Sequence, residues 1–262
     1  MFFLFFDFGV NAQVQVEQEV QATRPFRIGA GIGSSFGGYR EETDSEINRY
    51  YNSLFTYLID GAIEKGDFRH AFNIGFFMGE NTVASKFEDK YEPPRYFMYR
   101  ANIKYALDKR LWGDERFPGY FGGVFRTDIY FVSQTLEIAK YSAIFSVGAH
   151  ATQKWVINTQ SSLELSASLP LLGYAVRSPY PGVDHIQEKY LVEGTPLKIL
   201  TTGTFASVHN YWAMFGDLKY HYQLNRALSL NAGMGFELSR INVPLPRIDA
   251  IFRISAGFSL TF

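Results

Sequence analysis

The sequence contains no cysteine among its 262 residues. This absence excludes disulfide bonds, thiolate metal ligands and a cysteine nucleophile. Apolar residues also never extend into an uninterrupted run of the roughly 18 residues that a membrane-spanning helix requires. The charge is nearly balanced, with 25 Lys and Arg against 26 Asp and Glu, and no basic stripe is present. We therefore expect no nucleic acid among the partners of this protein.

Aromatic residues, by contrast, are abundant. The chain has 25 Phe and 17 Tyr, so that aromatic residues make up 17% of it while charged residues make up only 19%. The mean hydropathy of −0.10 is moderate for so many aromatic side chains. Strands that are apolar on one face only produce this combination, as in membrane barrels. A soluble β-sandwich can share the composition, so the order of the residues has to decide between the two.

The end of the chain, residues 250–262, alternates between apolar and small or polar side chains. One face carries Ala250, Phe252, Ile254, Ala256, Phe258, Leu260 and Phe262. The other face carries Ile251, Arg253, Ser255, Gly257, Ser259 and Thr261. A period of two residues predicts a β-strand, because successive side chains of a strand point to opposite faces. Taken alone, the segment also suits an amphipathic strand of a soluble sheet.

An apolar terminal strand that ends on an aromatic residue resembles the closing strand of the outer-membrane β-barrel superfamily of Gram-negative bacteria. The resemblance implies an all-β fold, a transmembrane antiparallel up-and-down β-barrel. It also implies that Phe258, Leu260 and Phe262 close the barrel and form the signal that the outer-membrane insertion machinery reads. The other implied partners are outer-membrane lipid and lipopolysaccharide.

The same alternation recurs along the chain and predicts about ten strands, with eight or twelve as alternatives. The segments are 26–36, 55–64, 69–78, 97–105, 120–129, 140–150, 155–167, 212–222, 228–238 and 250–262. An even number is typical of single-chain bacterial barrels. In a closed barrel the last strand pairs with the first, so we expect residues 250–262 to lie beside 26–36. Residues 26–262 then form the barrel domain.

The predicted connections alternate in length, which places both termini on the periplasmic side. Short turns are expected near Lys65, Thr152 and Leu224, and long loops after Phe36, Gly79 and Leu169. The turn over residues 108–116 is longer than this scheme requires.

The first 25 residues lack the strand pattern. Residues 1–12 are rich in Phe, Leu and Val and end on small residues, which is typical of an export signal. No basic residue precedes this run and Asp7 interrupts it, so we interpret residues 1–12 as the remnant of a signal peptide. Residues 13–25 are predicted to form a periplasmic N-terminal tail.

The face that alternation turns inward carries charges of both signs. We expect a polar lumen network of Asp60, Arg100, Arg126, Asp128, Glu164, Asp217, Lys219, Glu237 and Arg253. A barrel of about ten strands is narrow enough for side chains to fill its interior, and charges packed there need partners. The sequence thus favours a structural or accessory envelope protein, or a subunit of a larger outer-membrane complex. The alternative is a narrow channel for ions or small solutes.

A hydrolase is the second alternative, and the chain does not decide whether it is an enzyme. Asp184-His185 resembles the omptin protease couple only partly, since the omptin pattern has one residue between Asp and His. Ser207 and His209 have the residue types of a lipid A deacylase in reverse order, without an acid. We therefore assign no catalytic residue.

Few other residues of the sequence are candidates for a functional site. His150 and His221 are expected to point into the polar interior. No His, Asp and Glu cluster has metal-ligand spacing, so no metal and no cofactor are predicted.

The longest predicted interruption, residues 170–210, contains an apolar and aromatic stretch. Exposed apolar patches mark contact sites, so Tyr174, Arg177 and Tyr180 are candidates for contact with a protein partner. The alternative is that this loop packs on its own barrel.

Overall fold

The structure, a computed structural model, describes residues 26–41, 49–83, 96–133, 139–177, 196–242 and 246–262. The predicted signal remnant, 1–12, and tail, 13–25, lie outside the described residues, as do Tyr180, Asp184 and His185. Within the described ranges no helix is both long and apolar enough to cross a membrane.

The described chain consists almost entirely of β-strands. They are β1 (Phe26–Glu41), β2 (Arg49–Lys65), β3 (Phe68–Val83), β4 (Tyr96–Trp112), β5 (Gly119–Ser133), β6 (Ala139–Val156), β7 (Ser161–Arg177), β8 (Thr204–Ser207), β9 (Tyr211–Gln223), β10 (Leu228–Ile241) and β11 (Arg247–Thr261). A 3-10 helix, η2 (Pro196–Thr202), precedes β8.

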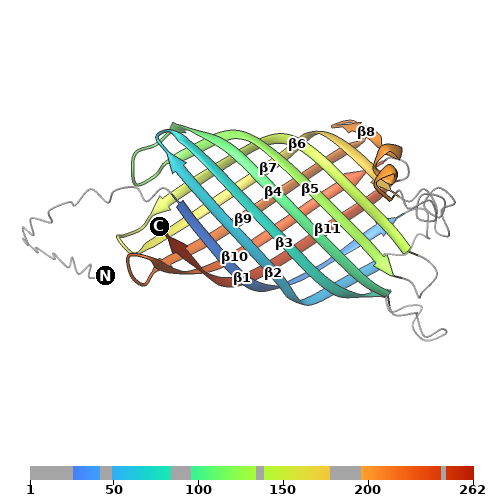
Figure 1. The fold of residues 1–262 in the computed structure, drawn as a ribbon, viewed down its shortest axis with the longest axis horizontal. Helices are drawn as coiled ribbons and strands as arrows, with labels where there is room; N and C mark the ends of the chain where they lie inside the picture. Colours follow the sequence, from blue (N-terminus) through green and yellow to red (C-terminus); the bar gives the residue numbers. More distant parts are fainter. Residues whose placement is uncertain (1–25, 42–48, 84–95, 134–138, 178–195, 243–245) are drawn as a thin grey trace, which may run out of the picture.

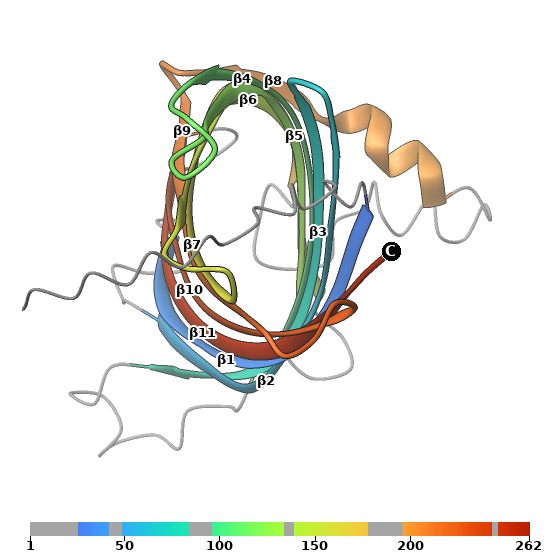
Figure 2. The same cartoon turned by 90° about the vertical axis from the view of Figure 1, so that its left-hand side faces the viewer.

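Ten of these strands close into one antiparallel barrel. The sheet runs β6-β5-β4-β3-β2-β1-β11-β10-β9-β7, and β6 pairs with β7 to complete the ring. The strands tilt around a single axis in Figure 1 and enclose an oval ring in Figure 2. The predicted all-β up-and-down barrel of about ten strands is therefore confirmed.

The pairing of β11 with β1 closes the barrel. Their register runs from Arg27 opposite Thr261 to Glu41 opposite Arg247. The backbone N–H of Phe262 donates to the carbonyl of Phe26 over 3.0 Å, and the two rings stack with centroids 5.9 Å apart. The first and last strands thus leave no unpaired edge between them, as a wall in lipid requires.

β8 is a short addition that pairs only with β7. Leu172 to Ala175 of β7 pair with β8, whereas Ser161 to Ser168 pair with β9. β8 and β9 run in the same direction and are separated by residues 208–210. β8 and β9 therefore occupy one place in the ring, beside β7. For this reason the eleven described strands form a ten-stranded barrel.

The two faces of the wall differ in polarity as the alternation predicts. Large apolar side chains cover the outside and are exposed, for example Ile59 on β2, Phe125 on β5 and Ile254 on β11. The side chains adjacent to them in the chain, such as Asp60 and Arg126, point inward. We call this outer apolar surface the apolar belt. A belt of this kind would be unfavourable in water and suits a lipid surround.

The two ends of the barrel also differ. Four short connections, 66–67, 113–118, 157–160 and 224–227, join strands at the end where β1 begins and β11 ends. We call this the short-turn end, and Figure 1 shows the C-terminus there. The opposite end, where the other connections start and finish, is the mouth.

Two predicted turn positions are wrong, because strands continue past them. Thr152 lies inside β6, which extends to Val156. The turn follows at 157–160, where Asn158 Oδ1 accepts a hydrogen bond from the N–H of Ser161. Strand β4 likewise passes Asp108 and ends at Trp112. The chain reverses at Gly113, whose φ of 81° favours glycine.

The predicted start of the long loop at residue 170 is also wrong. Strand β7 passes Pro170 and continues to Arg177. Pro170 is tolerated because the register with β6 shifts there: Gly148 lies opposite Pro170, but Val147 lies opposite Leu172. Such a bulge accommodates a residue that has no N–H to donate. The predicted interruption is therefore confined, within the described residues, to the part after Arg177.

Candidate functional site

The lumen near the mouth is crossed by a four-charge cluster of Arg100, Arg126, Asp128 and Glu237. Arg100 Nη2 donates to Asp128 Oδ1 at 2.9 Å and to Glu237 Oε2 at 2.5 Å. Arg126 bonds the same two carboxylates, with Nε 2.6 Å from Asp128 Oδ2 and Nη2 2.9 Å from Glu237 Oε1. All four side chains are largely buried. Charge-assisted bonds of this length are the strong class of hydrogen bond.

The four-charge cluster spans the full width of the barrel. Arg100 lies on β4 and Glu237 on β10, and these strands are five places apart in either direction around a ring of ten. The bond between them therefore joins diametrically opposite walls. Arg126 also lies over the ring of Phe215, 3.6 Å from its centroid.

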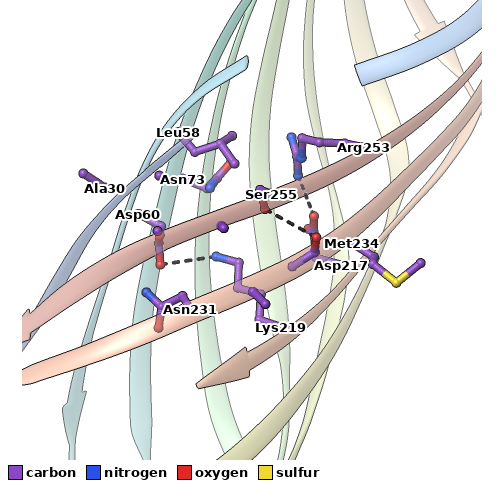
Figure 3. A pocket seen from close by; sticks show the side chains of 15 residues that line it. Ala30, Leu58, Asp60, Asn73, Asp217, Lys219, Asn231, Met234, Arg253 and Ser255 are labelled. Carbon is purple, nitrogen blue, oxygen red and sulfur yellow. Dashed lines mark hydrogen bonds and ion pairs between the residues drawn. The ribbon is translucent and has the colours of Figure 1, made fainter. Parts of the chain in front are cut away.

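A second layer of ion pairs fills the middle of the lumen (Figure 3). Asp217 on β9 accepts from Arg253 Nη2 at 2.8 Å, as Figure 3 shows. It also accepts from Lys104 Nζ at 3.3 Å. Lys219, two residues further along β9, reaches Asp60 on β2 at 3.2 Å. Lys104 and Asp60 come from strands four places from β9, so these bonds also cross the lumen.

A third layer lies toward the short-turn end. Arg69 Nη2 on β3 donates to Glu164 Oε1 on β7 at 2.6 Å, and Arg27 Nη2 lies 3.9 Å from the other oxygen of Glu164. Beside them His150 Nδ1 lies 2.8 Å from Asp108 Oδ2, and both side chains are buried. The lumen is thus bridged by charged groups at three depths.

Aromatic side chains cover these layers at the mouth. The guanidinium of Arg247 lies between the rings of Tyr39 and Tyr130, 4.9 and 3.9 Å from their centroids. Asp249 accepts two bonds from Arg247, at 2.6 and 2.8 Å. The stacked rings of Tyr51 and Phe77 belong to the same buried group.

Small hollows lie between the layers. Two small hollows of about 30 and 40 Å³ lie in the lumen, and both are lined by Asp60, Asn73, Asp217 and Lys219. Each has room for only a few water molecules. Both hollows are bordered by charged side chains of the second layer.

The structure brings the nine predicted lumen residues into ion pairs with one another or with Arg27, Arg69 and Lys104. The sequence reasoning missed Asp108, Arg247 and Asp249, because it assigned them to a turn and a loop. The sequence did indicate their inward position, since the alternation of apolar and polar residues continues through residues 105–108 and 247–250.

The residues considered for catalysis are not assembled into a site in the described part of the chain. The N–H of Ser207 bonds Asn210 Oδ1 at 2.7 Å, and His209 is exposed in the following turn. His150 and His221 point inward, where they contact Asp108 and Asn231. Among the described residues no group of three His, Asp or Glu side chains could hold a metal ion.

Of the predicted partner contacts, two lie in the described chain. Tyr174 packs its ring against Phe205, with centroids 5.0 Å apart. Its hydroxyl donates to the carbonyl of Leu200 and accepts from the N–H of Gly203, both at 2.9 Å. Arg177 is buried at the end of β7. Tyr174 therefore holds the η2–β8 segment against β7, which is contact within the chain.

Comparison with known proteins gives similarity in structure only. No protein-family model matches the sequence, and no curated protein matches it. The crystal structure of the outer membrane protease OmpT from Escherichia coli superposes with a TM-score of 0.56 at 7% identity, covering 91% of this chain and 97% of OmpT. The transport unit of the autotransporter AIDA-I from Escherichia coli matches with a TM-score of 0.42 at 8% identity, covering 95% and 94%. Neisserial surface protein A matches with a TM-score of 0.40 at 11% identity, covering 90% and 97%.

At these identities the likeness concerns the fold alone. The closed ring, the apolar belt and the polar interior agree with it. The chain is a closed antiparallel β-barrel with an apolar outer surface, and its fold is similar to that of the outer membrane protease OmpT.

Proposed function

We propose that this protein is a non-conducting outer-membrane barrel with a structural or accessory role in the envelope, on its own or as a subunit of a larger complex. The observation that carries the proposal is the ion-pair network that crosses the lumen at three depths, with Arg100 bonded to Glu237 on the opposite wall. Ion pairs fixed between opposite walls would obstruct the passage of solutes through the lumen. A filled interior also adds rigidity to a wall that lipid contacts on its outer side.

The proposed orientation places the short-turn end in the periplasm and the mouth outside the cell. Short periplasmic turns and longer extracellular loops are typical of bacterial barrels. Residues 1–12 would be the remnant of the export signal and 13–25 a periplasmic tail. Lipopolysaccharide would then surround the mouth half of the apolar belt.

Conductance across planar lipid bilayers tests the proposed function. We expect no current steps from the wild-type barrel, because charged side chains block the lumen. A variant with Arg100, Arg126, Asp128 and Glu237 all replaced by alanine removes the layer nearest the mouth without leaving one of its charges unpaired. It should also give no current steps, because the two deeper layers still cross the lumen. Steady current steps from the wild type, at voltages that leave the bilayer intact, would refute the proposal.

A narrow channel is the competing function, and one observation favours it. The two small hollows share four lining residues and are therefore adjacent along the lumen. A file of water could form there if the ion pairs opened. The same bilayer recording distinguishes the two functions, because a channel would show current steps with the wild-type protein.

Deleting Phe262 should lower the amount of assembled protein in cells far more than it lowers the stability of the folded barrel. The ring of Phe262 is largely exposed and stacks on Phe26, so its loss from the folded state costs no more than a few kcal/mol. A lost recognition signal would instead leave the chain unassembled. The measurement compares wild type and deletion variant in two ways: the amount of each protein in the outer membranes of cells, and the refolding of each from urea in vitro. Normal assembly in cells would show that Phe262 is not the signal.

A further inference from the structure

A shallow hollow interrupts the apolar belt where β10, β11, β1 and β2 meet, near the mouth. It measures about 590 Å³ and is lined almost entirely by apolar surface. Its floor is formed by small residues, Gly38 and Ala250, which lie opposite each other on β1 and β11. Its walls are Leu238 and Tyr50 on either side and the rings of Phe36 and Phe252 below.

The hollow has the shape and the apolar lining of a groove that accommodates an acyl chain. Phe36 and Phe252 lie opposite each other, with ring centroids 5.0 Å apart, and close the hollow on the side of the membrane interior. Gly38 and Ala250 leave the wall thin between Leu238 and Tyr50. A lipid chain that lay over these small residues would contact side chains on three sides.

Two arginines stand directly above the hollow on the mouth side. Arg240 of β10 and Arg40 of β1 lie opposite Ile248 of β11, one on each side of it. Both are exposed on the outer surface. Neighbouring strands are about 4.8 Å apart, so the two backbones are separated by about 10 Å. Trp212 lies beside Arg240 in the same row, which is typical of the membrane–water interface.

The two arginines are not neutralised by carboxylates of the described wall. Arg240 donates through Nε to Asn242 Oδ1 at 3.1 Å, and no carboxylate is paired with Arg40 within the described residues. The outward residues of these two rows are Trp212, Arg240, Ile248 and Arg40, then Met214, Leu238, Ala250, Gly38 and Tyr50. None of them is acidic.

We propose that this hollow and its two arginines form a binding site for one lipopolysaccharide molecule. An acyl chain would occupy the hollow, and phosphate groups on its headgroup would bind Arg40 and Arg240. Two separate cations on either side of one strand suit a lipid with more than one phosphate and several chains, which a phospholipid with a single phosphate such as phosphatidylglycerol is not. The site rests on the proposed orientation, with the mouth in the outer leaflet, but not on whether the lumen conducts.

The test is native mass spectrometry of the purified barrel in mild detergent, titrated with lipopolysaccharide that has a minimal core. The parallel arms use the same lipid after removal of its phosphates, and phosphatidylglycerol. We expect one lipopolysaccharide per wild-type barrel and weaker retention in both other arms. The double variant R40Q/R240Q should lose affinity by roughly tenfold or more, since it loses the charge-assisted bonds to phosphate.

Matched variants separate the site from general effects on the surface. K109Q/R116Q removes two exposed positive charges at the short-turn end and should bind as the wild type does. Ala250→Phe fills the hollow without changing any charge, and should weaken retention by a similar factor. Ala256→Phe makes the same change on the same outer face of β11, away from the hollow, and should have no effect. A difference in gel migration between unboiled and boiled samples shows that each variant is folded.

The proposal is overturned by any of four results: unchanged retention in R40Q/R240Q, unchanged retention in A250F, equal binding of the dephosphorylated lipid or of phosphatidylglycerol, or a second copy of the chain in place of lipid. Conductance of the wild type would refute the proposed function and leave this site untouched. The two proposals can therefore fail separately.

Discussion

Replacing Arg126 by methionine should lower the free energy of unfolding by about 3–5 kcal/mol, because it breaks a buried ion pair and leaves the other partner uncompensated. The side chain of Arg126 is only 5% exposed and donates to both Asp128 and Glu237. Methionine keeps much of the stem that packs on Phe215 but supplies no charge. Two buried carboxylates would then share Arg100 alone.

The measurement is refolding from urea into lipid bilayers, followed by the difference in migration between unboiled and boiled samples. Arg116→Met is the control, because Arg116 lies exposed in the turn 113–118 and its replacement should cost less than about 0.5 kcal/mol. In the double variant R126M/E237Q, removal of one carboxylate charge should recover at least about 1 kcal/mol of the sum of the single costs. If Arg126→Met costs no more than Arg116→Met, the network does not stabilise the barrel.

An arginine in place of Met234 should destabilise the barrel by about 2–4 kcal/mol in a bilayer, the cost of such a charge at the midplane. Met234 lies near the middle of β10, between Leu218 of β9 and Ile254 of β11, and is 49% exposed on the outer face. Its exposure in the barrel is exposure to lipid, so an arginine there cannot be hydrated without distorting the membrane.

Leu224 provides a matched control, because it is also 49% exposed but lies in the short turn 224–227. Leu224→Arg should cost no more than about 1 kcal/mol, since the penalty falls toward the interface. Ser229→Arg tests the other face of the same strand and places the charge toward the polar lumen. Refolding from urea into bilayers measures all three. Equal costs for Met234→Arg and Leu224→Arg would contradict the position of the membrane on this barrel.

The sequence by itself determined the faces of the wall and indicated about ten strands, with eight and twelve left open. Residues 250–262 show why, since the pleat of a strand sends alternate side chains to opposite sides and requires no information from elsewhere. Ile254 was therefore assignable to the outside and Arg253 to the inside. The same local rule, applied along the chain, predicts about ten strands and the inward charges.

Strand ends were less predictable, because a strand stops where its neighbour stops pairing. Alternation alone did not show that β6 continues through Thr152 to Val156, or that a bulge carries β7 past Pro170. Asp108 was assigned to a turn for the same reason, and its bond with His150 was missed.

Only the tertiary structure decided which inward and outward residues meet. Arg100 and Glu237 are 137 positions apart in the chain and touch because a ring of ten strands places β4 opposite β10. Arg40 and Arg240 stand above the same hollow because β11 pairs with β1 on one side and with β10 on the other. These contacts depend on closure of the barrel and on the register between strands. Each strand determines its own faces locally, but the level at which it meets the others is determined by the whole ring.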